Sequence, residues 1–162
     1  MNLAAPFPDN LSALVALYGP PSQVGFGSAV FYEPAMQTSD LEQVALRDYR
    51  FFVGDLWERF GETAWLSVWN QVYARPSGTP PNIVAELTAI AHPAAARYVP
   101  MLLLADSDDS KTAQQALAAA YDDPTVIELS VYTIGDGAAL SGLLIAGRLT
   151  TNETLVLISL LD

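Results

Sequence analysis

The sequence predicts a single α+β domain in which a mainly helical first two-thirds packs on a C-terminal antiparallel sheet. The chain has 162 residues, which is the usual size of one domain, and no linker divides it. Apolar residues recur every three or four positions through much of residues 10–121, whereas from Asp122 onward they follow a period of two. Such separation of helical from strand patterns is typical of α+β proteins.

The first expected elements are a short helix and one early strand. Helical spacing of apolar residues predicts a helix that is capped by Asp9 or Asn10 and ends at Gly19. From Val24 to Tyr32, apolar residues alternate with small ones, which predicts a strand that ends at Glu33-Pro34.

Two helices are expected next, and the first has the strongest pattern in the chain. Apolar residues form one continuous stripe over Leu41–Phe60, which predicts a single helix. Ser39 and Glu42 have the spacing of a capping box at its start, and Gly61 can end it. A second helix is predicted over Thr63–Ala74.

Further helical segments follow a loop rich in proline. One is expected over Asn82–Ala91 and another from His92-Pro93, which Pro100 should interrupt because proline lacks an N–H donor. Met101–Ala105 fits either a short helix or a buried strand. The last helix should be capped by Asp109 or Ser110 and run to about Tyr121.

The final third predicts a meander of three strands, over Thr125–Ile134, Leu140–Arg148 and Thr154–Leu161. Gly135-Asp136-Gly137 has the residues of the first turn, since aspartate and glycine tolerate turn conformations.

The last of these strands is uncharged and apolar on both faces. In a plain meander it would lie at an exposed edge, which favours aggregation. We therefore expect either that Val24–Tyr32 pairs with it as a fourth strand, or that a second copy covers it in a homodimer through the C-terminal sheet.

Composition excludes several classes of function. The formal net charge is −11, with 18 acidic and 7 basic residues, so nucleic acid and anionic membrane surfaces are disfavoured and a basic protein partner fits better. The chain has no cysteine, which excludes thiolate chemistry and Cys-ligated metals. The sequence has neither a signal-peptide pattern nor an apolar run long enough to span a membrane, so we expect a cytoplasmic protein.

No motif for a metal or a cofactor is complete. The acidic run 106–110 fails as a calcium loop because Lys111 stands where glycine is needed and Leu117 where glutamate is needed. His92 is the only histidine, and its place before a proline favours a structural role at a helix junction. Gly25 begins a partial dinucleotide motif that lacks its third glycine. We expect no metal and no cofactor.

Candidate binding residues come from the aromatic segments and the first turn of the sheet: Trp57, Trp65, Trp69, Asp136 and Ser141. Trp57 lies off the main apolar stripe of its helix, so it is either a second packing contact or an exposed binding platform. Carboxylates such as Glu58 and Glu86 could serve acid–base chemistry, but no spacing selects a catalytic pair.

Two hypotheses for function follow. The first is a non-catalytic protein-interaction or accessory module that acts through its acidic surface. The alternative is a small-molecule-binding domain or enzyme, with a pocket between the aromatic helices and the sheet.

Overall fold

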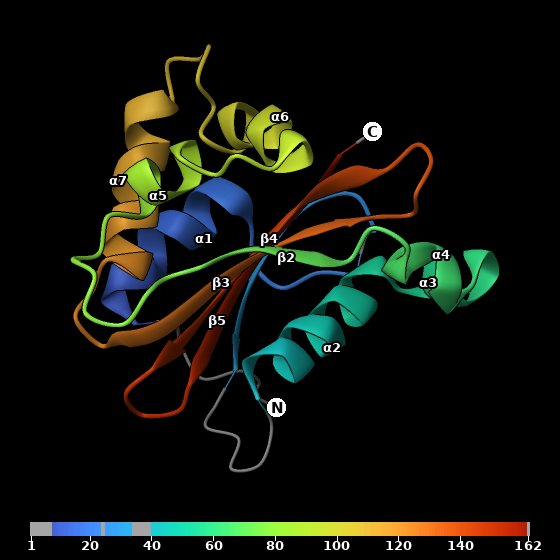
Figure 1. Ribbon diagram of the computed structural model, residues 1–162, viewed down its shortest axis with the longest axis horizontal. Coiled ribbons are helices and arrows are strands. Elements are labelled where there is room, and N and C mark those ends of the chain that lie inside the picture. Colours follow the sequence, from blue (N-terminus) through green and yellow to red (C-terminus); the bar gives the residue numbers. More distant parts are fainter. Residues whose placement is uncertain (1–7, 24, 34–39, 162) are drawn as a thin grey trace.

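The computed structural model describes residues 8–23, 25–33 and 40–161. These form one five-stranded antiparallel sheet with helices on both faces (Figure 1), in the strand order β1-β5-β4-β3-β2. The strands are β1 (Gly27–Glu33), β2 (Asn70–Ala74), β3 (Val126–Gly135), β4 (Ser141–Leu149) and β5 (Thr154–Leu161).

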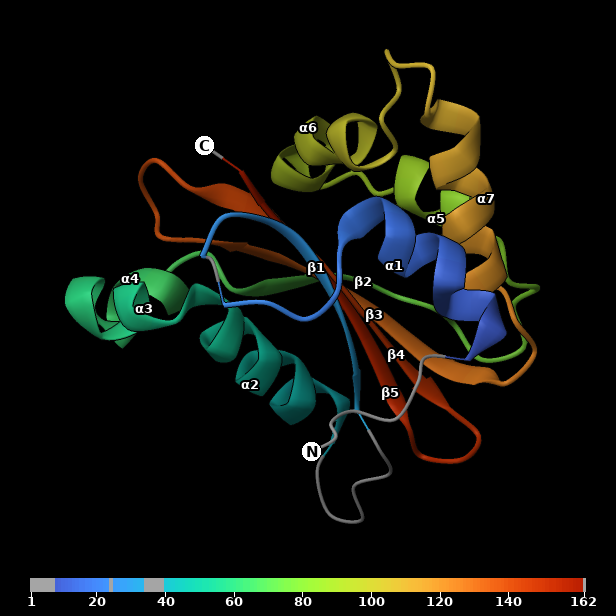
Figure 2. The same ribbon diagram turned by 180° about the vertical axis from the view of Figure 1, so that it is seen from behind.

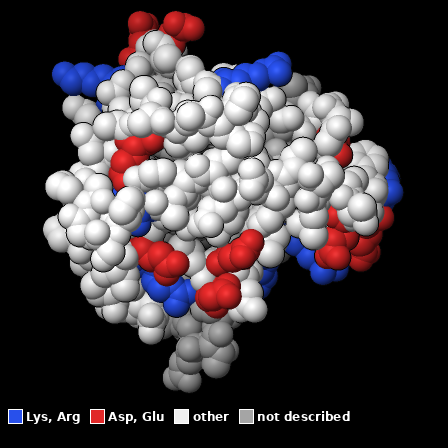
Figure 3. Space-filling model, viewed as in Figure 1, with Lys and Arg blue, Asp and Glu red and all other residues white. Residues whose placement is uncertain are grey.

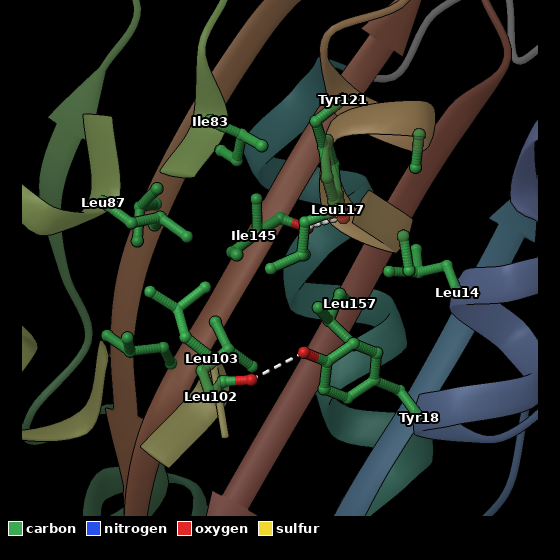
Figure 4. Packing of buried hydrophobic residues seen from close by; sticks show 14 of the residues in the cluster. Leu14, Tyr18, Ile83, Leu87, Leu102, Leu103, Leu117, Tyr121, Ile145 and Leu157 are labelled. Carbon is green, nitrogen blue, oxygen red and sulfur yellow. Dashed lines mark hydrogen bonds between the residues drawn. The ribbon is translucent and has the colours of Figure 1, made fainter. Parts of the chain in front are cut away.

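One face of the sheet is covered by a 3₁₀ turn and four helices (Figure 2). These are η1 (Asp9–Leu11), α1 (Ser12–Tyr18), α5 (Ile83–Thr88), α6 (Pro93–Leu102) and α7 (Ser110–Tyr121). Leucine and isoleucine side chains from the helices interleave with those of β4 and β5, and two tyrosines satisfy buried polar groups (Figure 4). The Tyr18 hydroxyl donates to the Leu102 carbonyl at 2.6 Å, and the Tyr121 hydroxyl donates to the Ile145 carbonyl at 2.9 Å.

The opposite face is covered by α2 (Leu41–Val53), α3 (Asp55–Phe60) and α4 (Glu62–Leu66). Its core is rich in aromatic rings. The hydroxyl of Tyr49 accepts the Gly135 N–H at 3.0 Å and lies 3.0 Å from the Trp65 carbonyl, so it ties α2 and α4 to the end of β3. The two cores make the molecule three layers thick (Figures 1 and 2).

The α+β class is confirmed, but the sheet is larger than a three-stranded meander. The predicted strand over Val24–Tyr32 corresponds to β1, although Val24 and Pro34 lie outside the described residues. β1 pairs with β5 along its length, for example Val30 with Leu157. Thus β5 lies inside the sheet between β1 and β4, and the reasoning from an exposed β5 edge no longer supports a homodimer. Self-association stays a prediction.

The helix expected over Thr63–Ala74 is wrong in its second half. α4 ends at Leu66, and the chain then forms the edge strand β2 against β3, with Asn70 opposite Thr133. Trp65 and Trp69 have helical spacing, but Trp69 stacks on Tyr132 of β3 with 4.4 Å between ring centroids. Pairing with a strand about sixty residues away has overridden the local pattern.

The single helix expected over Leu41–Phe60 is divided at Gly54, which has φ +67° and ψ −135°. A left-handed backbone of this kind favours glycine and ends α2. The capping box at the start of α2 is made by Asp40 and Gln43, one residue later than predicted; Ser39 lies outside the described part of the chain.

Three smaller features of the helices also differ from prediction: one cap, one end and one expected interruption. Neither Asp9 nor Asn10 caps the first helix with its side chain. The helix capped by Asn82 ends at Thr88 rather than Ala91. Pro100 does not interrupt α6, which continues to Leu102; because Pro100 is exposed, water can satisfy the carbonyl that loses its donor.

Among the helices that the structure describes, none has the length and apolar character needed to cross a membrane.

Candidate functional site

A pocket of about 450 Å³ lies at the end of the sheet, between α6 and the segment that joins α4 to β2. Figure 1 shows α6 and α4 on opposite sides of this end of the sheet. The lining comes from three parts of the chain: residues 67–70, residues 92–98, and the ends of β3 and β4 that meet at residues 133–142.

The first wall, residues 67–70, is held in place by hydrogen bonds. Thr133 of β3 donates its hydroxyl to the Val68 carbonyl at 2.6 Å, and Ser67 donates its hydroxyl to the Ala64 carbonyl at 2.6 Å. Trp69 donates its indole N–H to Glu42 of α2 at 2.9 Å. Because these bonds use the donors of Ser67 and Thr133, their oxygens face a ligand as acceptors only.

The second wall belongs to α6. His92 is the N-cap of this helix, and its Nδ1 accepts the Ala94 N–H at 3.2 Å. A neutral imidazole that accepts at Nδ1 carries its proton on Nε2, so His92 offers a donor to the pocket. Arg97 is exposed, and its guanidinium lies 5.6 Å from the centroid of the Tyr98 ring.

The floor is formed where β3 and β4 meet. Ser141 is half-buried and brings a hydroxyl to the lining, beside Gly142. A Cβ placed on Gly142 would lie 1.8 Å from the Ser159 carbonyl oxygen of β5. The position therefore requires glycine, and the backbone of the floor is fixed by close packing of β4 on β5.

The electrostatics of the pocket differ from those of the chain. No described residue of the lining carries a carboxylate, although the sequence has 18 acidic residues against 7 basic ones. Figure 3 shows acidic side chains in separate groups, with a broad uncharged area between them. Arg97, His92 and Ser141 bring side-chain donors to the pocket, which suit a ligand with acceptor or anionic groups.

The candidate residues from the sequence are distributed over several places. Ser141 and Trp69 line the pocket, although the Trp69 ring stacks on Tyr132 in the aromatic core. Trp57, 4% exposed, and Trp65 pack in that core and do not line this pocket. Asp136 accepts the N–H groups of Ala138 and Leu140, so its carboxylate shapes the turn between β3 and β4.

His92, interpreted from the sequence as structural, both caps α6 and lines the pocket. Arg97 and Tyr98 were not singled out by the sequence. An exposed arginine beside a half-buried tyrosine is common on amphipathic helices, so no sequence signal marks them.

Two groups of buried charged residues lie outside the pocket. Arg75, Glu86 and Asp122 form an ion-pair network with distances of 2.6 and 3.3 Å that joins β2, α5 and the end of α7. On the other face, Asp48 of α2 is 3% exposed, and burial and the neighbouring Glu33 raise the pKa of its carboxyl to about 9.

Within the part of the chain that the structure covers, no three His, Asp or Glu side chains converge as metal ligands. Comparisons with protein family models, curated proteins and solved structures found no match to this chain.

Proposed function

We propose that this protein binds a small anionic molecule, with a carboxylate as the simplest case, in the pocket between α6 and β2. The observation that supports it is a lining that contains Arg97 and His92 and no carboxylate among its described residues, in a chain of net charge −11. The acidic surface of such a chain repels anions. A site with arginine and imidazole donors therefore binds an anion in preference to the rest of the surface.

The size of the pocket agrees with this proposal. A volume of about 450 Å³ lies within the roughly 300–1,000 Å³ that is typical of small-molecule sites. The half-buried Tyr98 ring supplies apolar surface, and among the described lining residues Arg97 alone carries a formal positive charge. A ligand with one anionic group and a short apolar body therefore fits better than a polyanion.

The test is isothermal titration calorimetry with a series of small carboxylates and their amides, which have the same shape without the charge. Carboxylates should bind and amides should bind at least tenfold more weakly. Arg97→Gln should weaken binding about tenfold or more, because hydrogen bonds to charged groups contribute about 1.5–3 kcal/mol. Lys111→Gln removes the same charge from α7 and should leave the affinity unchanged.

His92→Asn separates the two roles of the imidazole. Asparagine is a strong N-cap residue, so α6 should keep its stability while the pocket loses the Nε2–H donor. Weaker binding with an unchanged melting temperature would support the proposal. If no member of the series binds, or if amides bind as tightly as carboxylates, the pocket does not select anions and the proposal is wrong.

A protein-interaction module is the second candidate function. Three phenylalanines, Phe26, Phe51 and Phe60, are about half exposed, and large exposed apolar side chains favour protein contacts. Native mass spectrometry over a range of protein concentrations tests the self-associating form of this proposal. A strictly monomeric species at all concentrations would remove the homodimer.

A further inference from the structure

A second pocket, of about 590 Å³, lies where α2 gives way to α3. Arg47 and Arg50 from the end of α2 and Arg59 from α3 all line it. The break at Gly54 turns the chain so that arginines from both helices face one space. Three of the seven basic residues of an acidic chain are thus gathered at one site.

The guanidinium groups at this site are not all used in ion pairs. Arg47 pairs with Glu33 of β1 at 3.2 Å. No carboxylate in the described ranges forms an ion pair with Arg50 or Arg59. The donors of Arg50 and Arg59 are therefore available to an anion that enters the pocket.

The surroundings of the arginines add a flat apolar surface. The Arg50 guanidinium lies 6.0 Å from the centroid of the buried Trp57 ring, which restrains it at the wall of the pocket. Phe51, 48% exposed, also lines the pocket and meets Phe31 edge-on. A ligand can therefore place its anionic group on the arginines and an apolar group on Phe51.

From this geometry we infer that the pocket between α2 and α3 binds a phosphate monoester. The planar donor forks of Arg50 and Arg59 match the oxygens of a phosphate group, and the three arginines of the lining outnumber its two carboxylates. Asp55 and Glu58 also line the pocket and reduce its positive potential. These two carboxylates therefore limit the affinity for an anion, and removing the charge of one of them should strengthen binding.

The probes are inorganic phosphate and phenyl phosphate, titrated into the full chain and followed by calorimetry and by the fluorescence of the tryptophans. Phenyl phosphate should bind saturably and more tightly than inorganic phosphate, with affinity that falls as sodium chloride is raised. Arg50→Gln and Arg59→Gln should each weaken binding tenfold or more, and Glu58→Gln should strengthen it several-fold.

Lys111→Gln is the matched control, because it removes an exposed positive charge from α7, which lines neither pocket, and should leave phenyl phosphate binding unchanged. Arg50 and Arg59 are exposed, and far-UV circular dichroism will show whether their variants stay folded. A peptide with one phosphotyrosine distinguishes the sources of the ester: tighter binding than phenyl phosphate indicates a phosphorylated protein, and equal binding a small molecule. Absence of saturable binding to both esters, or an Arg50→Gln/Arg59→Gln double variant that binds like the unmodified chain, would overturn the inference.

Discussion

The buried carboxyl of Asp48 leads to a prediction about stability and pH. Asp48 lies on α2 against the sheet, and its Oδ2 atom has no hydrogen-bond partner among the residues that the structure describes. Burial raises the pKa of this carboxyl most, the neighbouring Glu33 adds to the rise, and the charge of Arg47 acts in the opposite direction. The pKa of this carboxyl is raised to about 9, which favours the protonated form of Asp48 in the folded protein at neutral pH.

The sign of the effect follows from proton binding. In the unfolded chain an aspartate has a pKa of about 3.9, so between roughly pH 4 and pH 9 the folded state holds a proton that the unfolded state has lost. Stability from this group is therefore complete below pH 4, falls as the pH rises, and levels off above the folded pKa. The fall amounts to at most about 1.4 kcal/mol per pH unit.

The perturbation is Asp48→Asn, which keeps the shape of the side chain and removes its titration. Between pH 5 and pH 8 the free energy of unfolding of the variant, relative to the unmodified protein, should rise by up to about 4 kcal/mol. Urea unfolding, followed by the fluorescence of the buried Trp57 and Trp65, measures it. The lower limit is pH 5 because the isoelectric point of the sequence is near 4.2, where solubility is lowest.

The control is Asp108→Asn, which removes an exposed carboxylate from the loop before α7 and should change stability equally at both pH values. If Asp48→Asn destabilises the protein by the same amount at pH 5 and pH 8, the reasoning is refuted. Such a result would mean that Asp48 is ionised in the folded state and stabilised by Arg47.

Three further predictions concern stability and use chemical or thermal unfolding. Glu86→Gln should lower the free energy of unfolding by about 3 kcal/mol, because Arg75, whose side chain is 8% exposed, loses its closest carboxylate; an effect below 1 kcal/mol would contradict this. Trp65→Ala should lower it by about 3–5 kcal/mol through the cavity left in the aromatic core. Pro100→Ala should raise it by up to about 3 kcal/mol, since α6 regains a backbone donor, and a lower melting temperature would count against that reason.

Elements with strong local signals were predicted closely from the sequence. β5 has the predicted bounds, Thr154–Leu161, and β3 and β4 differ from prediction by one residue at each end. α7, Ser110–Tyr121, agrees with the first of the two predicted caps, Asp109, and with the predicted end near Tyr121. In each case the periodicity and the flanking turn residues agree, so no distant contact is needed to specify the element.

β2 shows why the rest could not be predicted. Its five residues are exposed or half-buried, and its place as a strand depends on pairing with β3 and on the stack of Trp69 on Tyr132. The pocket has the same origin, because its walls come from residues 67–70, 92–98 and 133–142. Ser141 and Trp69 could be named as candidates from local pattern, but their nearness to Arg97 follows only from the order of strands in the sheet.

The position of β5 restricts where a partner can bind. The sequence predicts that both faces of this strand must be covered by other elements. In the structure, Leu157 packs in the core formed with α1 and α7, and Val156 and Ile158 pack in the core formed with α2. Both of its edges are also paired, with β1 and with β4. The most apolar strand is therefore enclosed, and a ligand or partner must use the helical layers, the outer edges or the ends of the sheet. Both candidate pockets lie in such places, one at the end of the sheet and one at the break between α2 and α3.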